Sequence, residues 1–332
     1  MSDRVIRLPA LPEGYATGPP EEVVHLTEYV TREVDRGELA EARDAYLRGR
    51  RVPVSTVPVE GFPGTDASYA VEPTLSPYGS ELVETGAGPV RVSDGVVHLP
   101  GLLPPPGQDF QQQYRSCLEQ ADAALHAVGL GLASLVRTVD YTATATRTEY
   151  PRCGRPRREL LGGTGDDGDP VFPGAAGILV DHAVRPGVMV SLDATASTEP
   201  LRTVNPGWGR YATLTYRPGV LAGRTLFMSG FGALDPVTQS AVFPGDLLAQ
   251  AEYVYTAIHR VLREAGLGGG DVVRLVEYVT PGAVAGYAAL AEVRDRFFGR
   301  PDVALTSVVC SALLRPEFLI EVVPTAVAGG GR

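Results

Sequence analysis

The chain has 332 residues, about the length of two ordinary domains and ample for a buried core. Hydrophobic residues make up 44% of it and charged residues 20%, which excludes an intrinsically disordered protein. Asp and Glu (39) outnumber Lys and Arg (29), giving a formal net charge of −10. Because a phosphate backbone attracts the opposite charge, we expect no nucleic-acid partner.

Cysteine and histidine usage gives no indication of disulfides or metals. Cys117, Cys153 and Cys310 are too few for a disulfide framework, and the five histidines lack metal-ligand spacing. No phosphate-binding loop is recognisable, so we expect neither a metal nor a cofactor. A signal peptide and an apolar run of about 18 residues are both missing, which predicts a cytoplasmic protein without membrane contact.

Residues 1–80 are predicted to form an N-terminal extension. Residues 21–50 are expected to be helical, because their apolar residues recur near one helix face. Residues 52–80 are rich in turn formers and are expected to be irregular.

The remainder of the chain repeats itself. Residues 129–141 (GLGLASLVRTVDY) match residues 266–278 (GLGGGDVVRLVEY). Two other pairs of segments keep the same order at slightly different offsets: 98–101 with 227–230, and 184–196 with 314–326. The preserved order predicts one domain in two copies, covering residues 81–203 and 204–332.

Each copy is predicted to run strand, hairpin, helix, strand, helix, strand, strand. In the second copy, apolar residues between 250 and 265 recur at helical spacing and Gly266 suits a helix C-cap. A second helix is expected over 282–299, and residues 156–171 of the first copy are expected to be an exposed loop. The fold class is therefore α+β, with mixed sheets covered on one face by helices.

The second copy resembles the Rid/YjgF family of imine and enamine deaminases. The resemblance rests on TLFMSGFGALDP (225–236), on the helix, glycine stop and strand of 245–280, and on LRPEFLIEVVPTA (314–326). It covers about residues 206–328, and residues 85–200 match more weakly. It implies a chorismate-mutase-like fold, a homotrimer or a pseudo-symmetric assembly of the tandem domains, and sites in clefts between adjacent domains.

Family positions in the second copy mark a candidate site for a small molecule. The resemblance implies that Tyr216, Ser229 and Gly230 line the pocket and that Glu321 activates water. Glu321 lies in an apolar strand, where burial would raise its pKa and suit it to acid–base catalysis. The structural alternative is an interface glutamate paired with an arginine.

The family's substrate-binding arginine has no counterpart in this chain. Leu305 or Thr306 stands at its position in the second copy, and the first copy has Ser191 in place of the glutamate. We therefore expect one competent site per chain. Arg217 and Arg155 are the candidates for a replacement anchor, with Cys310 as a further candidate substrate contact.

The closing strand also resembles that of the chorismatases. Arg315, Pro316, Leu319 and Glu321 follow their Arg-Pro-x-Leu-Leu-x-Glu spacing, although Leu314 stands where they usually carry cysteine. The leading functional prediction is a metal-free acid–base enzyme that hydrolyses a small imine or enamine intermediate in specialised biosynthesis. The alternatives are a chorismatase-like hydrolase that releases pyruvate, and a non-catalytic ligand-binding or scaffold protein.

Overall fold

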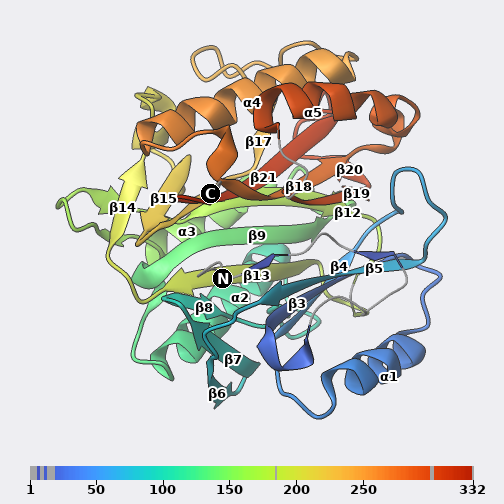
Figure 1. Cartoon of the computed structure of the whole chain (residues 1–332), viewed down its shortest axis with the longest axis vertical. Coiled ribbons are helices and arrows are strands. Elements are labelled where there is room, and N and C mark those ends of the chain that lie inside the picture. Colours follow the sequence, from blue (N-terminus) through green and yellow to red (C-terminus); the bar gives the residue numbers. More distant parts are fainter. Residues whose placement is uncertain (1–5, 8–10, 13–18, 184, 300–302, 331–332) are drawn as a thin grey trace.

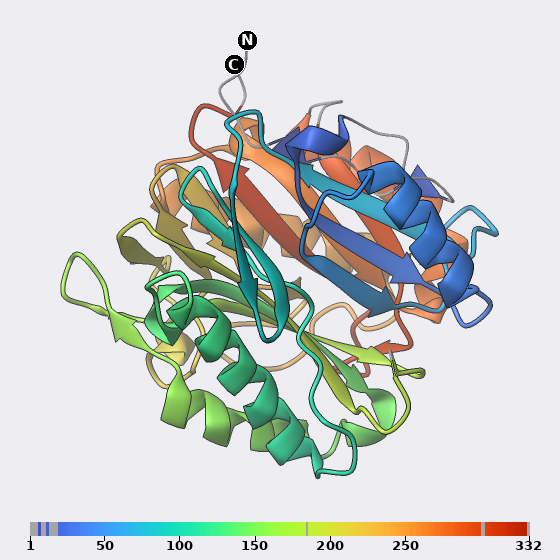
Figure 2. The same ribbon diagram turned by 90° about the horizontal axis from the view of Figure 1, so that it is seen from below.

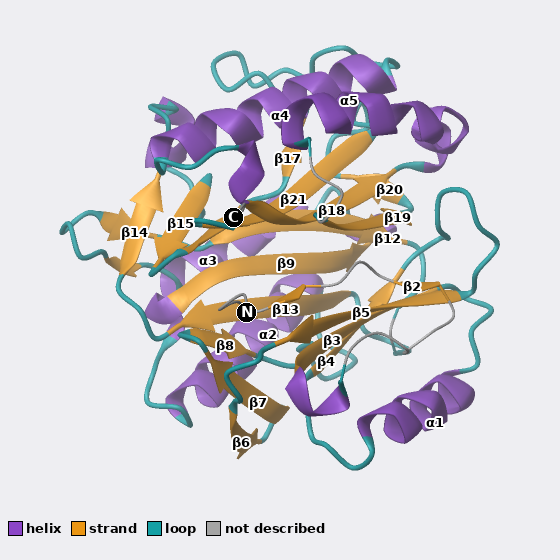
Figure 3. Ribbon diagram, in the orientation of Figure 1, coloured by secondary structure: helices purple, strands orange, loops and turns teal. Residues whose placement is uncertain are grey.

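The structure, a computed structural model, describes residues 6–7, 11–12, 19–183, 185–299 and 303–330. Its strands form mixed sheets around a shared interior, and its helices lie outside them (Figure 1, Figure 3). The predicted α+β fold with two tandem domains is therefore confirmed. No helix in the described ranges is long and apolar enough to cross a membrane.

The sheet of the second domain has the order β14-β15-β16-β21-β18-β19, with β17 beside β21. Its helices α4 and α5 cover the outer face (Figure 1). The Asp246 side chain caps α4 by accepting a hydrogen bond from the Ala249 amide, and Gly266 follows the helix with a φ of 74°. The bounds are β14 (Leu201–Val204), β15 (Gly219–Ala222), β16 (Thr225–Met228), β17 (Phe231–Gly232), α4 (Leu247–Glu264), β18 (Val272–Val279), α5 (Leu290–Phe298), β19 (Ala304–Val309) and β21 (Ile320–Val327).

The second predicted helix of this domain differs from the expectation in its first half. Residues 281–289 form a 3₁₀ helix, η7 (Pro281–Ala289), and only then does α5 begin. Two glycines in this half weaken α-helical propensity. Gly299 ends α5 in the left-handed conformation, as its position predicted.

The first domain carries the sheet β20-β12-β9-β13-β8-β7-β6, whose edge strand β20 comes from the second domain. The expected loop over 156–171 is wrong in part. Helix α3 occupies its start, with Pro156 and Arg157 buried and their neighbours exposed, and a short hairpin follows. The bounds are β6 (Glu81–Thr85), β7 (Gly88–Ser93), β8 (Val96–His98), α2 (Phe110–His126), β9 (Leu135–Ala143), η4 (Tyr150–Cys153), α3 (Gly154–Leu160), β10 (Gly163–Thr164), β11 (Pro170–Val171), β12 (Gly174–Val180), β13 (Val190–Ser197) and β20 (Ala312–Leu313).

The prediction for the N-terminal extension is wrong in its details. The segment expected to start a helix is a strand, because VVHLTEYV is rich in β-branched residues and almost entirely buried. The helix begins only after Asp35, which caps it, and the supposedly irregular segment holds two more strands. Helix α1 covers the outer face of this sheet (Figure 2). The bounds are β1 (Ile6–Arg7), β2 (Leu11–Pro12), β3 (Val23–Val30), α1 (Arg36–Leu47), β4 (Val54–Pro58) and β5 (Tyr69–Leu75).

The extension is a further, partial copy of the repeat. Strand β3 pairs in parallel with β4 and antiparallel with β5. Strand β9 pairs likewise with β12 and β13, and β18 with β19 and β21. Tyr29, Tyr141 and Tyr278 occupy equivalent positions on the long strands, and all three are buried in the core between the sheets. The hydroxyl oxygens of Tyr141 and Tyr278 lie 2.8 Å apart in a hydrogen bond.

Candidate functional site

A cavity of about 480 Å³ lies between the two tandem domains. The first domain contributes residues of β9, η4, α3 and β12 to its wall. The second domain contributes residues 208–216, β17, α4 and the chain leading into β21. A cavity of this size suits a small molecule, and its location agrees with the predicted cleft between adjacent domains.

Glu321 lies in this cavity wall near the start of β21. Its side chain is only 6% exposed, and its neighbours along the strand, Ile320 and Val322, are fully buried. Burial, together with the nearby Asp140 carboxylate, raises the pKa of Glu321 to about 8. At neutral pH the carboxyl is therefore mostly protonated and able to act as a general acid.

Gly230 makes room for that carboxyl. A β-carbon at Gly230 would overlap Oε1 of Glu321 and would also crowd the β-carbon of Ala176. The Gly230 amide donates to the carbonyl oxygen of Ala175 on β12 at 3.0 Å, which joins the two domains at this point. Ala175 and Ala176 of β12 line the cavity here. By the family resemblance, they stand at the first-copy position of the substrate-binding arginine.

Tyr216 lines the cavity beside an arginine. Nη2 of Arg210 donates a hydrogen bond to the Tyr216 hydroxyl at 3.2 Å. The Tyr216 ring meets the Tyr211 ring edge-to-face, with centroids 5.5 Å apart. Burial raises the pKa of the Tyr216 hydroxyl, so it remains a neutral hydrogen-bond donor at neutral pH.

Asp140 is a cavity residue that the sequence analysis missed. It lies on β9, is 1% exposed, and its Oδ1 accepts a hydrogen bond from the Tyr114 hydroxyl at 3.1 Å. Burial raises the pKa of Asp140 to about 6, although the neighbouring Arg157 acts in the opposite direction. Asp140 is thus mostly ionised at neutral pH, while Glu321 is mostly protonated.

Arginines supply positive charge around the cavity. Arg157 is buried, and its guanidinium donates to Tyr114, Thr138 and Thr215, which ties α3 to the second domain. The other cavity arginines form no ion pair with a carboxylate of the described chain; they are Arg158, Arg210, Arg260 and Arg315. They are therefore available to an anionic ligand.

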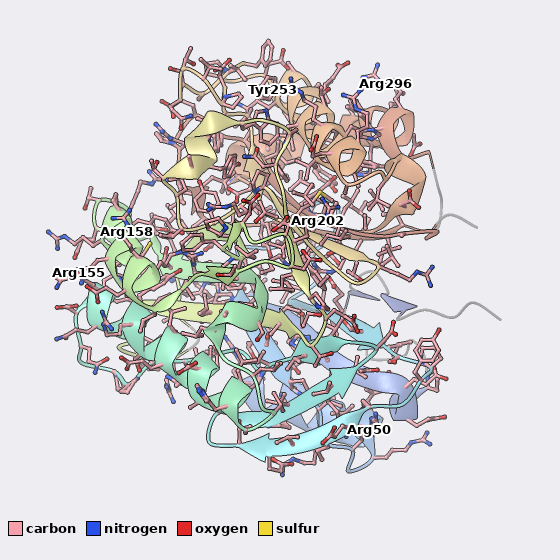
Figure 4. All side chains as sticks on the ribbon, turned by 90° about the vertical axis from the view of Figure 1, so that its left-hand side faces the viewer. Arg50, Arg155, Arg158, Arg202, Tyr253 and Arg296 are labelled. Carbon is pink, nitrogen blue, oxygen red and sulfur yellow. The ribbon has the colours of Figure 1, made fainter. Side chains whose placement is uncertain are left out.

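The two arginines proposed from sequence lie elsewhere. Arg155 is exposed and bonds Glu159 on the same helix, whereas Arg158 reaches the cavity; both lie at the surface near α3 (Figure 4). Arg217 is buried, but its guanidinium donates to backbone carbonyls, including that of Tyr211, and lies over the Phe172 ring. Neither residue lines the cavity.

Ser229 and Cys310 also lie outside the cavity lining. The Ser229 hydroxyl donates to the carbonyl oxygen of Arg217 and accepts from the Ala175 amide, so it fixes the domain junction. Cys310 is buried in the shared core, and burial raises the pKa of its thiol. Among the described residues, no cluster of three or more His, Cys, Asp or Glu side chains could hold a metal ion.

Comparisons with known proteins agree with the architecture. The family described as Endoribonuclease L-PSP matches residues 210–328. Protein DfrA of Myxococcus xanthus is 38% identical over 94 residues, covering 28% of this chain and 70% of the relative. A RutC family protein of Synechocystis sp. is 30% identical over 112 residues, covering 34% of this chain and 85% of the relative. A chorismatase crystal structure shares the fold over 98% of both chains, with a TM-score of 0.59 and 14% identity. The chain therefore belongs, through its second domain, to the Endoribonuclease L-PSP family, which is also called the RutC or Rid/YjgF family.

Proposed function

We propose that the protein is a hydrolase that cleaves the enol ether of chorismate, or of a closely related dicarboxylate, and releases pyruvate. One observation carries the proposal: a buried Glu321, whose pKa is raised to about 8, shares its cavity with arginines that have no carboxylate partner in the described chain. A proton donor among cations suits an anionic substrate whose reaction begins with protonation.

The charge of the cavity favours a dianion. Arg158, Arg210, Arg260 and Arg315 come from separate segments of both domains, so they could anchor more than one carboxylate. The family's single anchoring arginine is absent, which argues against the usual small monocarboxylate. Similarity of fold to a chorismatase along the whole chain supports the same substrate class.

In the proposed reaction, Glu321 gives its proton to the terminal methylene carbon of the enol ether. The resulting oxocarbenium ion is attacked by water, and the water's proton returns to Glu321. The bond between the hemiketal carbon and the ether oxygen then breaks: the hemiketal hydroxyl becomes the carbonyl of pyruvate, and its proton passes to the ether oxygen, which leaves as the ring alcohol. The sum is enol ether plus water giving alcohol plus pyruvate, with Glu321 back in its starting form.

The test is to incubate the protein with chorismate and follow pyruvate through oxidation of NADH by lactate dehydrogenase. We expect pyruvate release by the wild type and a loss of at least about 100-fold in Glu321→Gln. Arg155→Ala, which alters an exposed arginine outside the cavity, is the matched control and should retain full activity. The absence of pyruvate with correctly folded wild type would contradict the proposal.

A second candidate is hydrolysis of an imine, which is supported by the family match and by Tyr216, Gly230 and Glu321 lining one cavity. In that reaction the ionised carboxylate would activate water, so the rate should rise as the pH increases through the pKa of Glu321. Acid catalysis on an enol ether should show the opposite dependence. Ammonia release from freshly generated imino acids distinguishes the two reactions. Release of neither product would contradict both and would leave the third alternative, a non-catalytic ligand-binding or scaffold protein, to be tested.

A further inference from the structure

An acid on the long strand and an arginine on the following helix recur in the repeated units. In the N-terminal unit, Nη1 of Arg43 lies 3.2 Å from Oε1 of Glu28. In the second domain, Nη2 of Arg294 lies 2.8 Å from Oε2 of Glu277. Each acid directly precedes the equivalent core tyrosine of its strand. In both units the carboxylate is therefore neutralised by a direct partner.

The first domain departs from this pattern at Asp140. The aspartate side chain is one methylene shorter than the glutamates of the other two units. The helix arginine, Arg157, donates its hydrogen bonds to Tyr114, Thr138 and Thr215 instead. No direct ion pair joins Arg157 to Asp140 among the described contacts. The Asp140 carboxylate lies in the wall of the same cavity as Glu321, which the other domain contributes, and its negative charge acts on the Glu321 carboxyl.

We propose that Asp140 is the positioning residue for Glu321: its fixed negative charge, supplied by the first domain, holds the Glu321 carboxyl in its acid form. The inference rests on the proposed function for its catalytic meaning, because a proton donor is required there. The electrostatic part concerns the protein alone and is measurable without a substrate.

The order of ionisation supports this role. Asp140, with a pKa of about 6, loses its proton while Glu321 is still neutral. Glu321 must then ionise against an existing negative charge in a buried site, which adds to the effect of burial. The other titratable or charged groups that share this cavity or lie close to Glu321 are Tyr150, Cys153, Arg157, Arg158, Arg210, Tyr211, Tyr216, Tyr253, Arg260, Cys310 and Arg315.

The experiment is a pH titration of the ¹³C-labelled Glu321 carboxyl by NMR in the full chain. In Asp140→Asn, which keeps the size and the acceptor for Tyr114, we expect the Glu321 midpoint to fall by about 1 pH unit or more. Asp193→Asn is the matched control, because Asp193 is another acid whose pKa desolvation raises to about 6, and it lines a different cavity. It should leave the Glu321 midpoint unchanged. An unchanged midpoint in Asp140→Asn would overturn the proposal.

A second measurement does not depend on the folding of Asp140→Asn. In the wild type, the Asp140 carboxyl carbon should show its own titration step and a second, smaller inflection at the Glu321 midpoint. Glu321→Gln should remove the second inflection and keep the first. A wild-type Asp140 signal with one step only would overturn the coupling.

The pH profile of pyruvate release links the inference to the reaction. Activity should be present below the pKa of Glu321 and lost above it, and Asp140→Asn should move this loss to lower pH by the same amount as the NMR midpoint. Pyruvate release that keeps its profile despite a shifted NMR midpoint would overturn the catalytic role. A shifted midpoint in a protein that releases no pyruvate would uphold the coupling and reject the proposed function.

Discussion

The Glu321 carboxyl occupies the space beside Gly230 that a side chain at that position would fill. A β-carbon at Gly230 would overlap Oε1 of Glu321, so the acid holds its place only because the facing residue has no side chain. The same glycine donates its amide hydrogen to Ala175 across the domain junction. The position of the acid and the contact between domains therefore depend on one residue.

Gly230→Ala should for this reason abolish the proposed activity. The added methyl group would displace the Glu321 carboxyl or push β12 away, and we expect pyruvate release to fall by about 100-fold or more. Gly268→Ala is the matched control, since a β-carbon there meets nothing within 4 Å and its φ is −129°. Equal rates for the two variants would show that the Gly230 contact is not required.

Arg158→Ala should weaken substrate binding. Arg158 reaches the cavity without a carboxylate partner, so its loss should raise KM by about tenfold if it anchors a substrate carboxylate. Arg155→Ala removes the same charge from the same helix but alters only a surface pair with Glu159. Steady-state kinetics with chorismate should show a higher KM for the first variant alone; parallel changes in both would point to general charge effects.

Arg157→Met should destabilise the fold. Arg157 is buried and bonds Tyr114, Thr138 and Thr215, whose groups would lose their partner. We expect the free energy of unfolding to fall by about 3 kcal/mol or more, measured by urea denaturation. Arg152→Met, which removes an exposed pair with Glu149, should change it by less than about 1 kcal/mol. Similar midpoints for both variants would contradict this role of Arg157.

The tandem architecture was predictable because its signals are local. Helical spacing, glycine stops such as Gly266 and β-branched strands each occupy a short stretch, and the repeat presents them twice. The N-terminal copy was not predictable in this way. Its long strand, residues 23–30 (VVHLTEYV), is buried on both faces, so its apolar and polar residues do not alternate as in a half-buried strand, and its apolar residues also fit helical spacing.

The site was predictable only in its second-domain half. Glu321, Gly230 and Tyr216 follow family motifs, and all three line the cavity. Asp140 and Arg158 enter it from the first domain, and contact between segments so far apart leaves no trace in a single sequence. The segment around Arg158 was expected to be a loop, and a loop gives no rule for which of its arginines reaches the cavity.

Glu321 should also make the stability of the protein depend on pH. Its pKa in the unfolded chain is near 4.5, and burial followed by the Asp140 charge raises the pKa to about 8 in the folded state. Between these pH values the folded protein keeps a proton on Glu321 that the unfolded chain releases. The contribution of Glu321 to the free energy of unfolding is therefore complete below about pH 4.5 and is lost as the pH rises through about 8. Relative to Glu321→Gln, the wild type should lose a few kcal/mol of unfolding free energy across this range.

Urea denaturation of both proteins at several pH values isolates the contribution of Glu321, because the other buried acids, such as Asp140, titrate in both proteins. Parallel stability curves would mean that Glu321 ionises in the folded protein as it does in water, and acid catalysis by this residue at neutral pH would lose its physical basis.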